Sequence, residues 1–98
     1  MTLIQLIDKQ AKSTPSGAMV AKPLNCWGVK YPVGYNANPH FDGHDLLVYY
    51  PEDHPSGLLI DGVRHETSQG SFLSIPAHVN HQIEEVFDRP RYAMVWAV

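Results

Sequence analysis

The sequence predicts an all-β fold, a sandwich or barrel preceded by one short helix. After Gly17 the chain is a series of short runs rich in Val, Leu, Ile and aromatic residues, separated by clusters of Pro, Gly, Asn and Asp about every ten residues. Apolar residues recur at helical spacing only before Ser13. The length of 98 residues allows one domain with a modest core, so we expect a single domain over residues 1–98.

The N-terminal segment carries a helix-start signature. Thr2 is followed three residues later by Gln5, which is the spacing of a capping box. The apolar residues that recur at helical spacing are Leu3, Ile4, Leu6, Ile7 and Ala11. The pattern predicts a helix from Leu3 to Lys12, although the same residues also fit a strand in so short a window. The Ser, Thr, Pro and Gly residues at 13–17 then break the element.

The remaining runs are predicted strands. We place them at 18–22, 24–31, 45–50, 58–61, 63–66, 71–75, 81–87 and 91–97. The dipeptide Asp61-Gly62 tolerates positive φ between two apolar runs, so the fourth and fifth strands should form a hairpin. A second turn is expected at 68–70.

The last predicted strand, RYAMVWAV, is apolar on both faces. Such a strand is typical of a central position, or of one covered on its outer side by the N-terminal helix or by a second subunit. A chain of this size gains by covering the strand with a second copy, so we expect a homodimer.

Composition excludes several classes of protein. Hydrophobic residues make up 44% of the chain and charged residues 17%, which argues against disorder. The net charge is −3 and there is no basic run, so neither nucleic acid nor an anionic membrane is an expected partner. No apolar stretch is long enough to span a membrane, and no signal peptide is recognisable. The single cysteine, Cys26, is predicted to be a small buried hydrophobe, and a cytoplasmic location is expected.

The segment from Gly70 to Val86, GSFLSIPAHVNHQIEEV, contains the most informative spacing. Pro76 cannot donate a hydrogen bond to a sheet, so the strand before it should end there. A new strand begins near His81, and alternation places Ile83 on the same face. An imidazole on that apolar face is predicted to point inwards.

This spacing resembles the second signature of the cupin superfamily, G-x5-P-x-G-x2-H-x3-N. Gly70, Pro76 and His81 fall on its Gly, Pro and His, while His78 stands at the second Gly and Glu85 at the Asn. The order of elements from residue 39 to 86 is also the cupin order. The resemblance implies a small single-domain cupin, a jelly-roll β-barrel with a short N-terminal helix. In cupins this His binds a metal or lines the small-molecule pocket, which is the role implied for His81.

A narrower resemblance concerns residues 39–50, PHFDGHDLLVYY. This stretch is similar to the corresponding segment in the sugar-sensing domains of arabinose-type transcriptional regulators, which are cupins themselves. Those regulators use a separate helix-turn-helix domain for DNA binding, and no such motif is recognisable here. The likeness therefore concerns the pocket, and it implies a small-molecule ligand.

The first cupin signature supplies H-x-H and then a Glu, which bind a metal together with the later His. Here His40 stands at the first His and Asp42 at the second, while the Glu position falls on a leucine. The resemblance therefore retains two of the four ligands as written, and Asp42 is a substitute oxygen ligand. His44 lies two positions after Asp42 and four after His40, so in an unbroken strand all three side chains would point to the same face. Asp45 is a further candidate if the strand bulges.

The predicted metal ligands are thus His40, Asp42, His44 and His81. Two imidazoles and a carboxylate resemble the facial site of non-haem iron proteins, and a divalent Fe, Mn, Ni or Zn ion is the candidate cofactor. A solvated loop has the same composition of Pro, Asn, Gly, His and Asp, so a pocket without metal remains the alternative.

Four residues are candidates for contact with a small-molecule ligand, namely His81, His40, His78 and Tyr49. Glu85 is predicted to lie on the same face of the strand as His81. If its carboxyl is buried there beside Ile83, burial would raise its pKa to a range suited to a general base. At the outer end of the strand the same carboxylate would instead be solvated and inert. His54 and His65 are assigned to the surface.

Three classes of function follow from these observations. The first is binding of a small organic molecule, a sugar or a small acid, in a pocket around His81. The second is a metal-dependent oxygenase or isomerase that uses His40, Asp42 and His81 as ligands and Glu85 as base. The third is a non-enzymatic interaction protein. The sequence leaves open whether the protein is an enzyme.

Overall fold

The computed structural model describes residues 1–22 and 26–98. The described residues form one helix and nine strands. In chain order these are α1 (Leu3–Gln10), β1 (Lys12–Ser13), β2 (Met19–Ala21), β3 (Trp27–Tyr31), β4 (Leu46–Tyr49), β5 (His54–Ile60), β6 (Val63–Thr67), β7 (Phe72–Ile75), β8 (His81–Ile83) and β9 (Arg91–Ala97).

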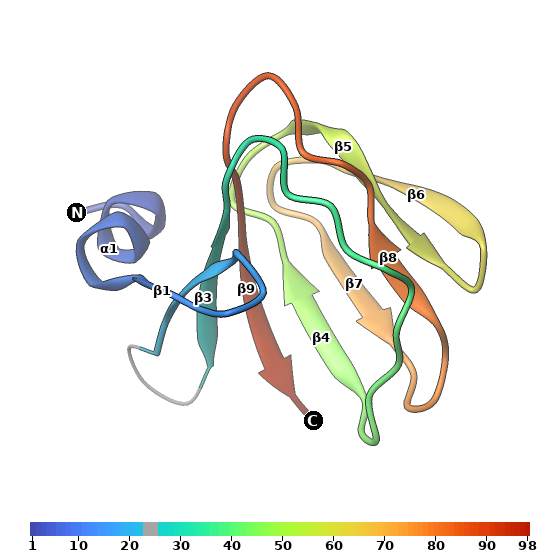
Figure 1. The fold of residues 1–98 in the computed structure, drawn as a ribbon. Helices are drawn as coiled ribbons and strands as arrows, with labels where there is room; N and C mark the ends of the chain where they lie inside the picture. The colour runs from blue at the N-terminus through green and yellow to red at the C-terminus, as the bar shows by residue number, and fades with distance from the viewer. Residues whose placement is uncertain (23–25) are drawn as a thin grey trace.

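The strands form two antiparallel sheets that face each other (Figure 1). The larger sheet has the order β1-β2-β3-β9-β4-β7, and the smaller one has the order β6-β5-β8. The irregular segment 34–42 runs along β8 and extends the smaller sheet: Gly34 donates to the carbonyl of Val86 at 2.7 Å, and His40 forms an isolated bridge with His81. Because residues 34–42 come directly before β4 in the chain, this segment links the two sheets.

The predicted helix is present and slightly shorter than expected. Thr2 and Gln5 form both hydrogen bonds of the capping box, at 2.8 and 3.1 Å. The helix ends at Gln10 because the next residues turn into an extended conformation and pair as β1 with β2. Ile7 is 1% exposed and packs on Gly28, where an added Cβ would lie 2.8 Å from its Cγ1. The helix therefore covers the outer face of the larger sheet.

The strand predictions are confirmed in position and differ mainly at their ends. The hairpin at Asp61-Gly62 is confirmed, and these residues have φ angles of 51° and 77°. Strand β9 has the predicted bounds. Strand β5 begins four residues before the predicted start, because a bulge between His54 and Leu58 accommodates Pro55 in the strand. The start of the strand predicted at 24–31 lies outside the described residues.

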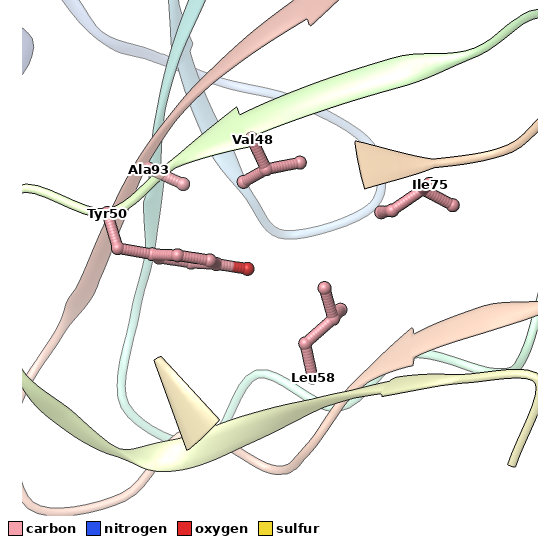
Figure 2. Close-up of a cluster of buried hydrophobic side chains, with 5 residues drawn as sticks. All are labelled: Val48, Tyr50, Leu58, Ile75 and Ala93. Carbon is pink, nitrogen blue, oxygen red and sulfur yellow. The ribbon is translucent and has the colours of Figure 1, made fainter. Parts of the chain in front are cut away.

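The main core lies between the two sheets. Val48, Ile75 and Ala93 come from the larger sheet and face Leu58 of β5, with Tyr50 beside them (Figure 2). A second cluster, which includes Ile7, Tyr92 and Met94, lies on the other side of the larger sheet under α1. Strand β9 contributes to both, which explains why both of its faces are apolar.

Two further sequence predictions concern individual features. Cys26 is buried and carries a free thiol, as expected for a small hydrophobe. Among the described residues, no helix has the length and apolar character needed to cross a bilayer.

Candidate functional site

A cavity of about 260 Å³ lies between the two sheets. Most of its wall is apolar, and the side chains come from both sheets, among them Val29, Leu46, Val48, Leu58, Ile75 and Ile83. Polar side chains are a minority of the lining, and Ser16 and Tyr35 are among them. His40, Asp42 and His81 line one end, which we call the mouth, and the tyrosines at positions 31 and 50 line the other.

The mouth brings together three of the predicted metal ligands. One potential ligand atom from each of His40, Asp42 and His81 lies within 4.8 Å of the other two. The Nε2 atom of His81 is 3.4 Å from the Oδ2 atom of Asp42, and the two imidazole centroids are 4.3 Å apart. Two backbone hydrogen bonds between His40 and His81, of 3.0 and 2.8 Å, hold the segments together. We call these three residues the His-Asp cluster.

The backbone fixes which nitrogen of each ring faces the cluster. The Nδ1 atom of His40 lies 3.2 Å from the carbonyl oxygen of Asn38, and Nδ1 of His81 lies 3.2 Å from that of Val79. A carbonyl oxygen only accepts, so Nδ1 carries the hydrogen and Nε2 keeps a free lone pair in the neutral ring. Metal-binding histidines are usually oriented by such a bond from the second nitrogen.

The donor set therefore fits a divalent transition metal. Two imidazole nitrogens and one carboxylate oxygen match the ligands of many Fe, Mn, Ni and Zn sites and leave coordination positions open. His81 is 7% exposed, Asp42 is half-buried and His40 is exposed, so the cluster extends from the cavity wall to solvent.

Two predicted residues near the mouth lie outside the cluster. His44 is exposed, because the chain bends at Gly43 and the predicted alternation does not continue past Asp42. His78 is also exposed, and its ring lies against Phe41 with a centroid separation of 6.0 Å. Only the backbone of His78 contributes to the site, since its N–H donates to the carbonyl of Asp42 at 2.8 Å.

The structure places Tyr49 and Glu85 away from the cavity, and for Glu85 this is the solvated alternative that the sequence left open. Tyr49 lies on the outer face of β4 and packs on Phe72 at 4.8 Å, while its neighbour Tyr50 lines the cavity. Glu85 is exposed, because β8 ends at Ile83 and the alternation that would place it beside His81 stops there. Its carboxylate is therefore not positioned to act as a base in the cavity.

Sequence reasoning did not single out Tyr31 and Tyr50 at the other end of the cavity, or Arg91, which packs against Tyr50. We call these three residues the inner end. Arg91 is fully buried and donates hydrogen bonds to the carbonyl of Ser56 and to the hydroxyl of Thr67. Its guanidinium carbon lies 4.4 Å from the centroid of the Tyr50 ring. The available signal was strand alternation, because Arg91 lies on the same face of its strand as Ala93 and Val95, which face the interior.

No protein-family model matches this sequence, and no curated protein matches it. The fold, in contrast, is similar to solved structures. An RmlC-like cupin from Shewanella frigidimarina superposes with a TM-score of 0.70 at 16% identity, over 88% of this chain and 79% of that chain. KdgF from a Halomonas species gives a TM-score of 0.69 at 16% identity, over 88% and 83%. The polyketide cyclase RemF from Streptomyces resistomycificus gives 0.68 at 18% identity, over 88% and 71%.

The chain has the cupin fold. Because the identities are only 16% and 18%, these similarities establish the fold alone. The likeness to the sensor domains of arabinose-type regulators stays a prediction.

The cupin fold explains the glycine position in the second signature. His78 occupies that position and has a φ of 63°, a conformation that glycine adopts without cost. Val79 donates to the carbonyl of Pro76 at 3.3 Å, so the turn forms without the glycine. The turn delivers His81 to the cavity wall, which is why the spacing from Pro76 to His81 predicted the inward imidazole correctly.

Proposed function

We propose that this chain binds a small organic molecule inside the cavity, in contact with His81 at the mouth. The observation that carries the proposal is a mostly apolar cavity of about 260 Å³ with a few polar side chains in its wall. Small-ligand sites have this composition, since apolar walls provide most of the contact and a few polar groups fix the orientation.

Of the two predicted ligand classes, a small organic acid suits this chamber better than a sugar. A sugar carries hydroxyl groups around its whole ring, and each must find a hydrogen-bond partner when it leaves water. The wall formed by Val29, Val48, Leu58 and Ile83 offers none from its side chains. An acid with an apolar body needs polar partners at one end only.

A metal-dependent enzyme, an oxygenase or isomerase, is the second candidate, and the His-Asp cluster favours it. His40, Asp42 and His81 would hold a divalent Fe, Mn, Ni or Zn ion through atoms that lie within 4.8 Å of one another. Such an ion acts as a Lewis acid on a ligand oxygen. The residues of the chain orient the ligand and exclude water from the apolar part of the chamber. The third class, a non-enzymatic interaction protein, has no observation of its own in its favour.

The assembly that goes with this function is a closed jelly-roll barrel in a homodimer. The bridge between His40 of segment 34–42 and His81 of β8 supports closure of the barrel on that side. On the outer face of the larger sheet, Tyr49 packs against the helix-covered cluster, Leu47 and Phe72 lie beyond it, and Phe72 is 57% exposed. Light scattering should give twice the chain mass for the wild type and the chain mass for Phe72→Glu. Phe41→Glu, at an exposed position by the mouth, should leave the dimer intact.

Ligand binding is tested by filling the chamber. Val48 points into the cavity, whereas its neighbour Leu47 lies on the outer face of the same strand. Fluorine NMR with 4-fluorobenzoate should show binding to the wild type and to Leu47→Phe, and no binding to Val48→Phe. Because the added ring enters empty space, Val48→Phe should stay folded by circular dichroism. Equal binding to both variants would place the probe outside the chamber.

Metal binding is tested by elemental analysis of protein purified without chelators. We expect close to one Fe, Mn, Ni or Zn ion per chain in the wild type and background levels in His81→Ala. His44→Ala is the matched control, because His44 lies two positions after Asp42 but outside the cluster. Loss of metal in His44→Ala as well, or background metal in the wild type, would contradict the metal site.

A further inference from the structure

We propose that the inner end of the cavity, formed by Tyr31, Tyr50 and Arg91, receives the acidic group of the ligand. The ligand would then be a small carboxylic acid that enters with its carboxylate first and leaves its other end near the His-Asp cluster. The proposal rests on the proposed ligand binding, but it requires no metal.

The first argument is the buried charge of Arg91. The side chain is 0% exposed, and a guanidinium stays protonated in proteins. Both of its acceptors, the carbonyl of Ser56 and the hydroxyl of Thr67, are neutral. Its Nε atom finds no hydrogen-bond partner among residues 1–22 and 26–98. Within the described part of the chain, none of the ion pairs involves Arg91.

A buried cation without an anion is costly, because it has lost its hydration without gaining a compensating charge. Glu84 supplies only a small part of that charge, because Arg91 is the last of the groups that lower the pKa of its carboxyl. Its carboxylate accepts from Arg64 at 3.0 Å and from the backbone N–H of Gly57 at 2.6 Å, and these bonds lower the pKa of Glu84. An anion in the adjacent chamber would compensate the charge of Arg91.

The second argument is position. Arg91 is directly opposite Tyr31 in the pairing of β3 with β9, and it has the same parity as Ala93 and Val95, both of which line the cavity. Tyr50 lines the cavity, Arg91 does not, and the guanidinium carbon of Arg91 lies 4.4 Å from the centroid of the Tyr50 ring. Figure 2 shows the phenol oxygen of Tyr50 pointing into the space between the sheets. The two phenols therefore touch the ligand, and Arg91 acts through them.

The third argument is the protonation state of the phenol groups of Tyr31 and Tyr50. Burial raises the pKa of Tyr31 and of Tyr50, and the charge of Arg91 only partly opposes this, so both keep their hydrogen at neutral pH. A protonated phenol donates a hydrogen bond, and such a bond is stronger when the acceptor is a carboxylate. The low dielectric of the interior extends the influence of the fixed cation.

The mouth favours the same orientation. In the absence of a metal, the carboxylate of Asp42 lies there, half-buried and 3.4 Å from His81. It repels a second carboxylate at that end. The chamber is thus negative at the mouth and positive behind the inner end.

The test compares two probes of nearly equal shape in metal-free protein, 4-fluorobenzoate and the neutral 4-fluorobenzamide, by fluorine NMR titration. We expect the acid to bind about tenfold more tightly, since a charged acceptor strengthens the hydrogen bonds and adds the attraction of Arg91. Tyr31→Phe and Tyr50→Phe should each weaken binding of the acid several-fold and binding of the amide much less, because a neutral carbonyl accepts a weaker hydrogen bond. Tyr49→Phe, on the outer face of β4, should change neither.

Arg91→Met provides a direct test of the charge if the variant folds, and the preference for the acid should then disappear. If Arg91→Met does not fold, Tyr31→Phe and Tyr50→Phe still test the proposal. Equal binding of the two probes to the wild type would overturn this inference while leaving ligand binding intact. A preference that survives in Tyr31→Phe and Tyr50→Phe would also overturn it. Failure of both probes to bind would overturn the inference and the proposed ligand binding together.

Discussion

The two ends of the cavity use polar residues in opposite ways. At the mouth, His40 and Asp42 come from the irregular segment 34–42, and each imidazole of the His-Asp cluster gives only one nitrogen to the backbone. At the inner end, Arg91 begins a seven-residue strand and donates to Ser56 and Thr67 inside the core. The mouth therefore holds unused ligand atoms, whereas the inner end has hydrogen bonds built into the packing.

Because of this difference, we expect the free energy of unfolding and the binding of ligands to depend on different residues. Residues whose functional atoms are unused in the folded chain can be replaced at small cost, because the removed atoms had no structural partner. Residues whose hydrogen bonds are buried cannot be replaced without leaving the partner unsatisfied. Substitutions at the mouth should change binding with little change in the free energy of unfolding, and substitutions at the inner end should change both.

The largest effect on stability is expected for Arg91→Ala. The substitution leaves a cavity and two buried acceptors without donors, so the free energy of unfolding should fall by about 3 kcal/mol. Asp42→Ala, at the half-buried mouth, should change it by less than about 1 kcal/mol. Urea denaturation of the two variants measures the contrast. Equal losses would show that the two ends do not differ in structural role.

Metal binding should stabilise the protein through the mouth alone. At a free metal concentration about 100 times the dissociation constant, the expected gain in unfolding free energy is about 2.7 kcal/mol. The gain should disappear on chelation and be absent in Asp42→Ala, while His44→Ala should retain it. Urea denaturation with and without metal gives the measurement. A similar gain in Asp42→Ala would place the metal elsewhere.

The sequence predicted those parts of the structure that depend on local chemistry. The turn at Asp61-Gly62 requires positive φ at two adjacent residues, and the strand from Arg91 to Ala97 has no interrupting Pro or Gly. His81 was placed correctly because the spacing from Pro76 defines a turn followed by a strand. His40 then lies opposite His81 through one antiparallel bridge.

Predictions that depended on long-range pairing were less successful. Which of Tyr49 and Tyr50 faces the cavity is decided by the register of β4 with β7 and β9, and the run LLVYY fits both choices. Glu85 was assigned by alternation, but β8 stops after three residues, where the backbone of Glu84 pairs with the bulge at Gly57. Arg91 was missed because a strand with two apolar faces conceals one charged residue at its start.

The assignment of His54 to the surface was wrong, because His54 is buried near Arg91, and the inner end should respond to acid through it. Its Nδ1 atom accepts the N–H of Ser56 at 3.0 Å, and Nε2 lies 2.8 Å from the carbonyl of Arg89, which fixes a neutral ring. Burial lowers the pKa of His54 below its ordinary value of 6.5. The unfolded chain therefore takes up the proton first, so stability is complete above pH 6.5 and declines as the pH falls through the lowered pKa.

For one proton the slope is at most about 1.4 kcal/mol per pH unit. His54→Gln keeps a donor and an acceptor but does not titrate, so its unfolding free energy should fall less between pH 7 and pH 5 than that of the wild type. Urea denaturation at several pH values measures the two slopes. Identical slopes would show that His54 does not carry the acid sensitivity of the inner end.

The smallest effect is expected at His78, in the turn that delivers His81 to the mouth. A φ of 63° costs a residue with a side chain roughly 1 kcal/mol, and glycine avoids this cost but loses more backbone entropy on folding. His78→Gly should therefore raise the free energy of unfolding by less than about 1 kcal/mol, whereas His78→Ala keeps the strain and should give no gain. Both variants should keep the metal content of the wild type, because only the backbone of His78 contacts the cluster. A loss of metal in both would instead show that the exposed imidazole takes part in binding, and the mouth would then contain a third histidine ligand.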